Sequence, residues 1–79
     1  MEGSIFTTSK ITGKTYSNYN SIRILNMYQN YFYLKNGVPL QDIELSTDRK
    51  TGRPLFVFVY NRDDTKEAFD SWCRQKDGT

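Results

Sequence analysis

Few side chains in this sequence are of the types that commonly perform chemistry. There is no histidine, so the commonest general base and metal ligand is missing. Cys73 is the single cysteine and has no histidine partner, which favours an incidental or buried thiol over an activated nucleophile. We therefore expect a protein that is not an enzyme, with no catalytic residues, no metal site and no cofactor.

Two pairs of acidic residues lie close together in the sequence. Asp42 and Glu44 are two positions apart, which places both on one face of a strand. Asp63 and Asp64 precede a predicted helix, where acidic side chains cap the first turn and suit the positive end of the helix dipole. Capping accounts for the second pair without catalysis, and a carboxylate-based site at the first pair is the less favoured interpretation.

The segment LFVFVY, residues 55–60, is apolar or aromatic at every position. A strand with one face in water alternates apolar with polar residues, so this strand is predicted to have an unusual second face. Alternation gives it two apolar rows, one of Leu55, Val57 and Val59 and one of Phe56, Phe58 and Tyr60. We expect the aromatic row to face away from the helices, because the smaller row leaves more room beneath them. Burial of the outer row under an N-terminal loop that carries Ile11, Tyr16 and Tyr19 is the alternative.

The elements that must position these residues follow from turn and helix signals. Asn36-Gly37 followed by Pro39 ends a helix, and the turn over residues 48–53 carries Asp, Thr and Gly. The predicted elements are a strand over residues 4–8, a helix over 19–35, strands over 40–47 and 54–60, and a helix that begins at Asp63 or Asp64.

The length of 79 residues allows one small domain, with an ordered core over about residues 4–76. The order β-α-β-β-α predicts an α+β fold, in which a three-stranded, mostly antiparallel sheet carries two helices on one face. The strand over 55–60 is predicted to be central, between the strand over 40–47 and the N-terminal strand.

Helical periodicity over residues 19–35 predicts which side chains of that helix face the core. The predicted core arc consists of Ile24, Leu25, Tyr28, Tyr31 and Phe32. Arg23, Asn26 and Asn30 fall on the opposite, polar side. Tyr19 and Tyr33 fall on or beside that side, where they are candidates for a contact surface.

Several short segments resemble a known family. They are Phe6-Thr7-Thr8, the helix SIRILNMYQNYFYL, Ile43, and Phe56-Val57-Phe58 before an acidic helix cap. Over about residues 5–72, the chain resembles a family of small proteins of phages, prophages and mobile elements of Gram-positive bacteria that has no established activity. The resemblance implies an origin, and small phage accessory proteins often bind and block a host protein. It therefore implies a host protein as partner and inhibition of host defence as a role.

The residues themselves predict a protein-binding module that contacts a host protein or a second copy of itself. The candidate binding residues are Phe56, Phe58, Tyr60, Tyr19, Tyr33, Arg49, Lys50 and Arg53. The alternative is a nucleic-acid-binding module, in which the aromatic row stacks on bases and the basic turn meets phosphate. Eleven Lys and Arg against nine Asp and Glu give a formal charge of +2, which is low for that alternative.

No apolar run approaches the 18 residues of a membrane-spanning helix, and the N-terminus lacks the apolar core of a signal peptide. We therefore expect a cytoplasmic protein, located in the host cytosol if a phage encodes it, without membrane contact.

Overall fold

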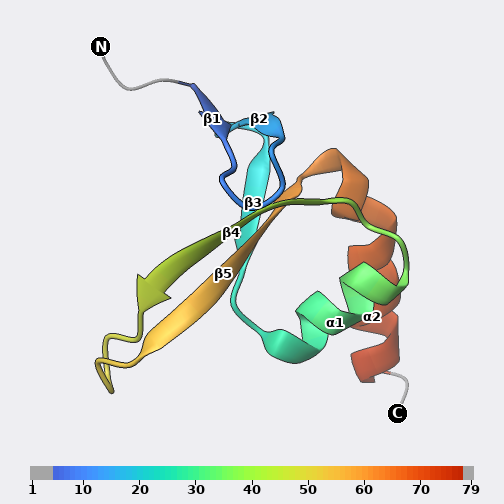
Figure 1. Cartoon of the computed structure of the whole chain (residues 1–79). Helices are drawn as coiled ribbons and strands as arrows, with labels where there is room; N and C mark the ends of the chain where they lie inside the picture. Colours follow the sequence, from blue (N-terminus) through green and yellow to red (C-terminus); the bar gives the residue numbers. More distant parts are fainter. Residues whose placement is uncertain (1–4, 78–79) are drawn as a thin grey trace.

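The computed structural model describes residues 5–77, and Ser4, where the first strand was predicted to begin, lies outside them. The chain has an α+β fold with two helices and two antiparallel sheets (Figure 1). The strands are β1 (Phe6–Thr8), β2 (Thr15–Ser17), β3 (Ser21–Ile24), β4 (Leu40–Thr47) and β5 (Pro54–Asn61). The helices are α1 (Met27–Lys35) and α2 (Lys66–Asp77), and a 3-10 turn, η1 (Asp63–Thr65), precedes α2.

The larger sheet has the order β3-β5-β4, and both outer strands are antiparallel to β5. β5 is therefore the central strand, but its second neighbour is β3. The N-terminal strand β1 instead forms a separate two-stranded sheet with β2. The predicted arrangement, in which the N-terminal strand completes the larger sheet, is therefore wrong. A register shift between Leu40 and Asp42 bulges β4 at its start.

The predicted helix over residues 19–35 is two elements. Its first part is β3, because Ser-Ile-Arg-Ile alternates polar and branched apolar residues and pairs with the end of β5. Asn26 then caps α1, and its side chain accepts a 3.1 Å hydrogen bond from the backbone N–H of Gln29. The end of the helix lies where it was predicted, with Asn36 as C-cap and Gly37 in the left-handed conformation at φ 84°.

α1 turns a different face to the core from the one predicted. Asn30 and Tyr33 are its buried residues, whereas the predicted core arc contains three exposed side chains, Leu25, Tyr28 and Tyr31. A polar residue is buried here because it has partners, since Asn30 Nδ2 donates to the carbonyl of Ile24 at 3.1 Å. Periodicity alone assigned the asparagine to the solvent side.

The hydrophobic core joins both helices to the sheet. Tyr33 of α1 and Tyr60 of β5 are fully buried and meet edge to face, with ring centroids 5.3 Å apart. Phe32 and Trp72 bring the two helices together at a centroid distance of 5.6 Å. The core cluster consists of Tyr33, Val38, Tyr60 and Ala68, with Ile22, Ile24, Phe32, Leu40, Phe58 and Trp72 packed around it.

The residue that caps the start of the last helical segment is not the predicted one. The Oδ1 of Asn61 accepts hydrogen bonds from the backbone N–H groups of Asp63 and Asp64, at 2.8 and 3.3 Å. The predicted cap by Asp63 or Asp64 is therefore replaced by an asparagine at the end of β5. Asp63 instead accepts from Asn20 at 3.2 Å and pairs with Lys66 at 3.3 Å.

A buried carboxylate attaches the β1–β2 hairpin to the larger sheet. Asp42 accepts hydrogen bonds from Ser9 Oγ at 2.5 Å and from the Tyr16 hydroxyl at 2.7 Å. Burial acts to raise the pKa of Asp42, but these two donors and the N–H of Ile43 outweigh it and hold the pKa below its ordinary value. The carboxylate therefore stays ionised and well bonded inside the protein.

The rest of this attachment is also polar. Thr12 Oγ1 donates to the carbonyl of Gln41 at 2.7 Å, and Lys14 Nζ donates to the carbonyl of Leu40 at 3.1 Å. These contacts place the hairpin loop on the bulged start of β4. The outer edge of β4 is therefore occupied at its start by the N-terminal hairpin.

The β4–β5 hairpin extends as an arm beyond the helices (Figure 1). The radius of gyration is 13.8 Å, compared with about 12 Å for a compact domain of this length. The arm carries the second half of β4, the turn and the first half of β5. Its side chains are therefore the part of the larger sheet that no helix covers.

Candidate protein-contact surface

The two rows of β5 face the opposite way from the expectation. Tyr60 and Phe58 pack against the helices, so the aromatic row is the inner row at its C-terminal end. The expectation that this row faces away from the helices is wrong. The large rings fill the space between the sheet and the helices, where Ala68 on α2 leaves room for them.

The register of the β4–β5 hairpin gives the physical reason. The turn pairs Leu45 with Phe56 and Ile43 with Phe58, so the apolar side of β4 lies beside the aromatic row of β5. Glu44, on the polar side of β4, lies opposite Val57. The apolar sides of both strands therefore coincide, on the side where Phe58 and Tyr60 join the core cluster.

We name the part of this side that extends past the helices the apolar ledge, formed by Ile43, Leu45, Phe56 and Phe58. Exposure rises along it toward the tip of the arm. Phe58 and Ile43 are half-buried, Phe56 is 57% exposed and Leu45 is 72% exposed. Leu45 and Phe56 are direct cross-strand neighbours, so two large apolar side chains meet in water.

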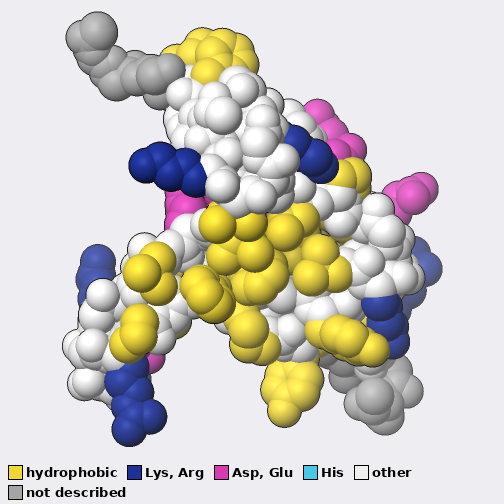
Figure 2. All heavy atoms as spheres, viewed as in Figure 1, with side chains coloured by type: hydrophobic (Ala, Val, Ile, Leu, Met, Phe, Trp, Pro, Cys, Tyr) yellow, Lys and Arg dark blue, Asp and Glu magenta, His cyan; other side chains and the backbone are white. Residues whose placement is uncertain are grey.

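The ledge continues the core without a break. Phe58 lies between Ile24 on β3 and Ile43 on β4, and it packs against the core cluster. Figure 2 shows hydrophobic side chains gathered over the middle of the molecule, between the arm and α1, and continuing onto the arm. A contiguous exposed apolar surface of this kind on a small protein typically marks an interaction site.

The other side of β5 carries the valine row. Val59 is fully buried and Val57 nearly so, and both lie on the opposite face of the strand from Phe58 and Tyr60. Arg23 and Glu44 bridge this side from the two outer strands, with Nε–Oε1 at 2.9 Å and Nη2–Oε2 at 3.3 Å. The hydrogen bond to Glu44 raises the pKa of Arg23. A two-pronged ion pair therefore lies across the valine row.

The N-terminal hairpin covers the remainder of that side. Asp42 is the cross-strand neighbour of Val59, and Tyr16 is buried with its hydroxyl on Asp42. The alternative of a covering N-terminal loop is thus correct for Tyr16. It is wrong for Ile11 and Tyr19, which are exposed at 64% and 79%.

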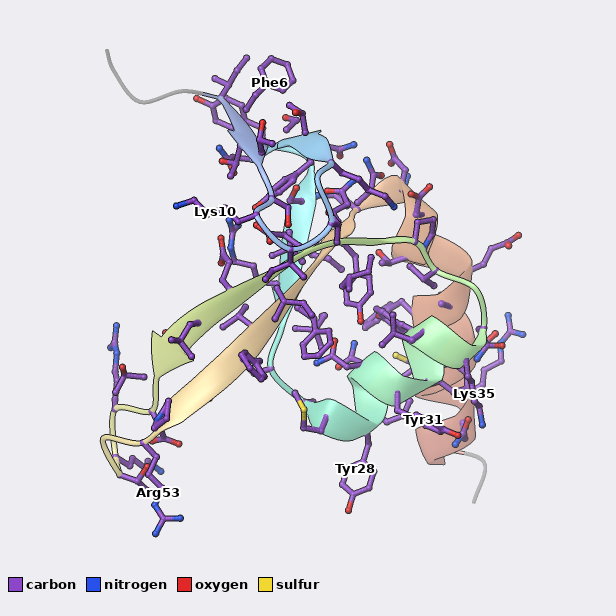
Figure 3. The ribbon with its side chains drawn as sticks, in the orientation of Figure 1. Phe6, Lys10, Tyr28, Tyr31, Lys35 and Arg53 are labelled. Carbon is purple, nitrogen blue, oxygen red and sulfur yellow. The ribbon has the colours of Figure 1, made fainter. Side chains whose placement is uncertain are left out.

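The basic turn at the tip of the arm is ordered by Asp48. Its Oδ1 accepts from the backbone N–H of Lys50 at 2.7 Å and of Thr51 at 3.2 Å. Arg49, Lys50 and Arg53 are all exposed, and Figure 3 shows Arg53 extending from the tip into solvent. These three candidate residues therefore lie together, next to the ledge along the strands.

Arg49 and Lys50 also line a groove of about 660 Å³, which is open on the side away from the helices. Its walls include Arg23, Leu25 and Leu55. The groove and the ledge lie on opposite sides of the arm, because Leu55 and Phe56 alternate along β5.

The remaining aromatic candidates do not join this surface. Tyr33 and Tyr60 are fully buried in the core, so neither reaches a partner. Tyr19 precedes Ser21, which pairs with Asn61 at the far end of β5 from Phe56. Three aligned exposed aromatics, as base stacking requires, are therefore not present on β5, where Phe56 is the exposed member of the row.

Two exposed residues on α1 lie apart from the arm. Tyr28 is 81% exposed and points away from the helix into solvent (Figure 3). Tyr31 is stacked by Lys35, whose Nζ lies 5.4 Å from the ring centroid. The sequence periodicity placed both tyrosines in the core, and the structure corrects this.

Comparisons with known proteins add no identification. No family model, curated protein or solved structure matches this chain. Within the described part of the chain, no helix is long and apolar enough to cross a membrane. Across residues 5–77, no three His, Cys, Asp or Glu side chains are grouped so that they could hold a metal ion.

Proposed function

We propose that this protein is a non-enzymatic binding module that contacts another protein through the apolar ledge on its β4–β5 arm. The observation that carries the proposal is the pairing of Leu45 with Phe56. They are cross-strand neighbours, both are largely exposed, and they continue a row that is core at its other end. Burying exposed apolar surface against a partner is favourable by about 25 cal/mol per Å².

The surroundings of the ledge support a specific contact. The arm is stiffened by an eight-residue strand pair, and the Arg23–Glu44 pair holds the outer strands to β5 on the reverse side. The basic turn lies at one end, where Arg49, Lys50 and Arg53 suit a partner with acidic residues beside an apolar patch. We take both helices to cover the ledge side of the sheet, which leaves the arm as the open surface.

The resemblance to phage and mobile-element proteins adds a class of partner. On that basis we propose a host cytosolic protein as the target and inhibition of host defence as the role. The ledge supports contact with a protein surface whatever the origin of the chain. The origin and the inhibitory role rest on the resemblance.

Affinity capture from a Gram-positive bacterial extract tests the proposal. The bait variants are wild type, a double variant Leu45→Ser with Phe56→Ser, and Tyr28→Ser as a control for loss of an exposed ring. We expect proteins that wild type and Tyr28→Ser retain and that the double variant releases. Retention of the same proteins by all three baits would show that the ledge is not the contact surface.

Nucleic acid is an outcome that the same variants distinguish. Binding through the basic turn weakens steeply with salt, because phosphate contacts release counterions. If Arg49→Ala with Lys50→Ala abolishes salt-sensitive binding of mixed oligonucleotides while the ledge variant does not, the basic turn is the functional surface and the proposal fails.

A further inference from the structure

The outer edge of β4 carries backbone groups with no strand beside them. The larger sheet ends at β4 on one side and at the four-residue strand β3 on the other. At the start of this edge, the side chains of Thr12 and Lys14 donate hydrogen bonds to the carbonyls of Gln41 and Leu40. Beyond them, no described strand pairs with the outer side of β4.

The hydrogen bonds of the hairpin show which groups point outward. The N–H of Asp48 donates to Arg53 across the hairpin at 2.8 Å, so the N–H groups of Ser46 and Glu44 also point toward β5. Those of Thr47, Leu45 and Ile43 then point away from it. Ile43 supports this assignment, because its N–H donates to its neighbour Asp42 Oδ1 at 2.8 Å rather than to β5.

The free stretch of edge is therefore Ile43 to Thr47, and its midpoint is Leu45. The open groups are the carbonyl of Ile43 and both backbone groups of Leu45 and Thr47. Glu44 is the one charged side chain in this stretch, and it is engaged by Arg23. Natural edge strands usually carry unpaired charges, prolines or bulges that prevent pairing, and this stretch has none of these protections.

We infer that two copies of this chain pair through these edges, antiparallel about a two-fold axis at Leu45, to form one six-stranded sheet. The inference rests on the proposed function and adds a second copy of the chain as a partner, at the outer edge of the strand that carries the ledge. The axis stands perpendicular to the sheet, so the two ledges lie on the same side and adjoin.

This register satisfies the open groups other than the Thr47 carbonyl, and it sets no like charges opposite each other between residues 43 and 47. Leu45 of each copy exchanges N–H···O bonds with Leu45 of the other, and each Thr47 N–H meets the carbonyl of the opposite Ile43. The N–H of Ile43 is not required, since Asp42 already accepts it. Glu44 lies opposite Ser46 of the second copy, so no two carboxylates face each other within the paired stretch.

The pairing also buries apolar side chains. Leu45 lies beside its own symmetry mate on the ledge side, where it is 72% exposed in the single chain. The row then runs from Phe56 through both Leu45 residues to the second Phe56. Apolar cross-strand pairs of this kind stabilise a sheet.

Single-cysteine crosslinking tests the register in the full chain with Cys73→Ser. The axis places the two Leu45 Cα atoms about 5.5 Å apart, within disulfide reach, and the two Thr47 Cα atoms on the order of 14 Å apart. We expect Leu45→Cys to form a disulfide-linked dimer under mild oxidation at least about ten-fold faster than Thr47→Cys. Equal rates, or no Leu45→Cys dimer, would overturn the inference.

A second experiment uses Leu45→Pro. This substitution removes a backbone N–H that points away from β5, and it removes no hydrogen bond between β4 and β5. We expect sedimentation equilibrium to show a dimer for wild type and a monomer for this variant, with the helical circular dichroism kept. A strictly monomeric wild type that still captures a different protein through the ledge overturns the inference alone. Loss of that ledge-dependent capture is the separate result that overturns the proposed function.

Discussion

The hydroxyl of Tyr60 on the central strand donates a 2.9 Å hydrogen bond to the Oδ1 of Asn30 on α1, and both side chains are buried. This bond fixes the rotation of the helix, because a buried amide must find partners. The Asn30 amide also uses its donor, because Nδ2 donates a hydrogen bond to the carbonyl of Ile24. The polar residue that periodicity places in solvent is therefore the one that joins the helix to the sheet.

Replacing Asn30 with Leu is expected to destabilise the fold by about 2 kcal/mol, because the Tyr60 hydroxyl and the Ile24 carbonyl lose their partner in a buried site. Denaturant unfolding measures the change. In a cycle with Tyr60→Phe, the double variant should cost less than the sum of the single variants, with a coupling of about 0.5–3 kcal/mol. Strict additivity would show that the bond does not couple the two residues.

Serine substitutions along the aromatic row are expected to separate core from surface. Tyr60→Ser should cost roughly 3–5 kcal/mol, because a fully buried ring is lost. Phe56→Ser should cost less than about 1 kcal/mol, because more than half of that side chain is already in water. Thermal and denaturant unfolding of both variants give the comparison. Similar losses at the two positions would contradict the assigned orientation of β5.

Alkaline pH is expected to destabilise the protein through two tyrosines. Burial raises the pKa of Tyr60 to about 12, and burial with the hydrogen bond to Asp42 raises the pKa of Tyr16 to about 12, from an ordinary value of 10.0. Above pH 10 the unfolded chain ionises these residues while the folded chain keeps their protons. The free energy of unfolding should therefore fall as pH rises from 10 to about 12.

Denaturant unfolding at a series of pH values measures that slope. Tyr16→Phe and Tyr60→Phe each remove one of the two groups, so each variant should show a flatter fall between pH 10 and 12. Slopes equal to that of wild type would mean that neither tyrosine is responsible.

The buried carboxylate is expected to control the N-terminal hairpin. Asp42→Asn removes the charge that accepts from Ser9 and Tyr16, so amide exchange in β1 and β2 should accelerate while β5 stays protected. Because the folded pKa of Asp42 lies below its ordinary value of 3.8, its stabilising contribution is present at neutral pH and lost as pH falls through the folded pKa. Wild type should therefore release the hairpin in acid.

Hydrogen exchange followed by NMR resolves the two regions. The exposed Asp63→Asn serves as the matched control, since Asp63 contacts Asn20 and Lys66 and not the hairpin. If β5 in Asp42→Asn loses protection together with β1 and β2, the hairpin is an inseparable part of the fold and this expectation is wrong.

The β4–β5 hairpin and the end of α1 could be predicted from the sequence. The strand over residues 40–47 shows period-2 alternation, and residues 48–53 contain the Asp and Gly that the turn uses. Gly37 ends α1 as its position predicts. The orientation of β5 could also have been predicted, because a turn that pairs residue 48 with residue 53 places Phe56 opposite Leu45.

The segment before α1 and the helix face were harder to predict. Ser21 to Ile24 fits both a helix and a short strand, and pairing with β5 decides between them. Asn30 and Asp42 are buried polar residues whose partners lie 30 and 33 residues away along the chain, at Tyr60 and Ser9. Local pattern carries no information about such partners, so neither burial was accessible from the sequence.

The central claim is that the ledge on the arm is a protein-contact surface, and site-specific photo-crosslinking in cells tests it most directly. A benzophenone amino acid replaces Phe56 in one variant and Tyr28, which is exposed on α1, in the other. We predict discrete crosslinked proteins from position 56 and none of them from position 28, with a product of twice the chain mass if the partner is a second copy. No crosslink from position 56, or the same products from both positions, would contradict it.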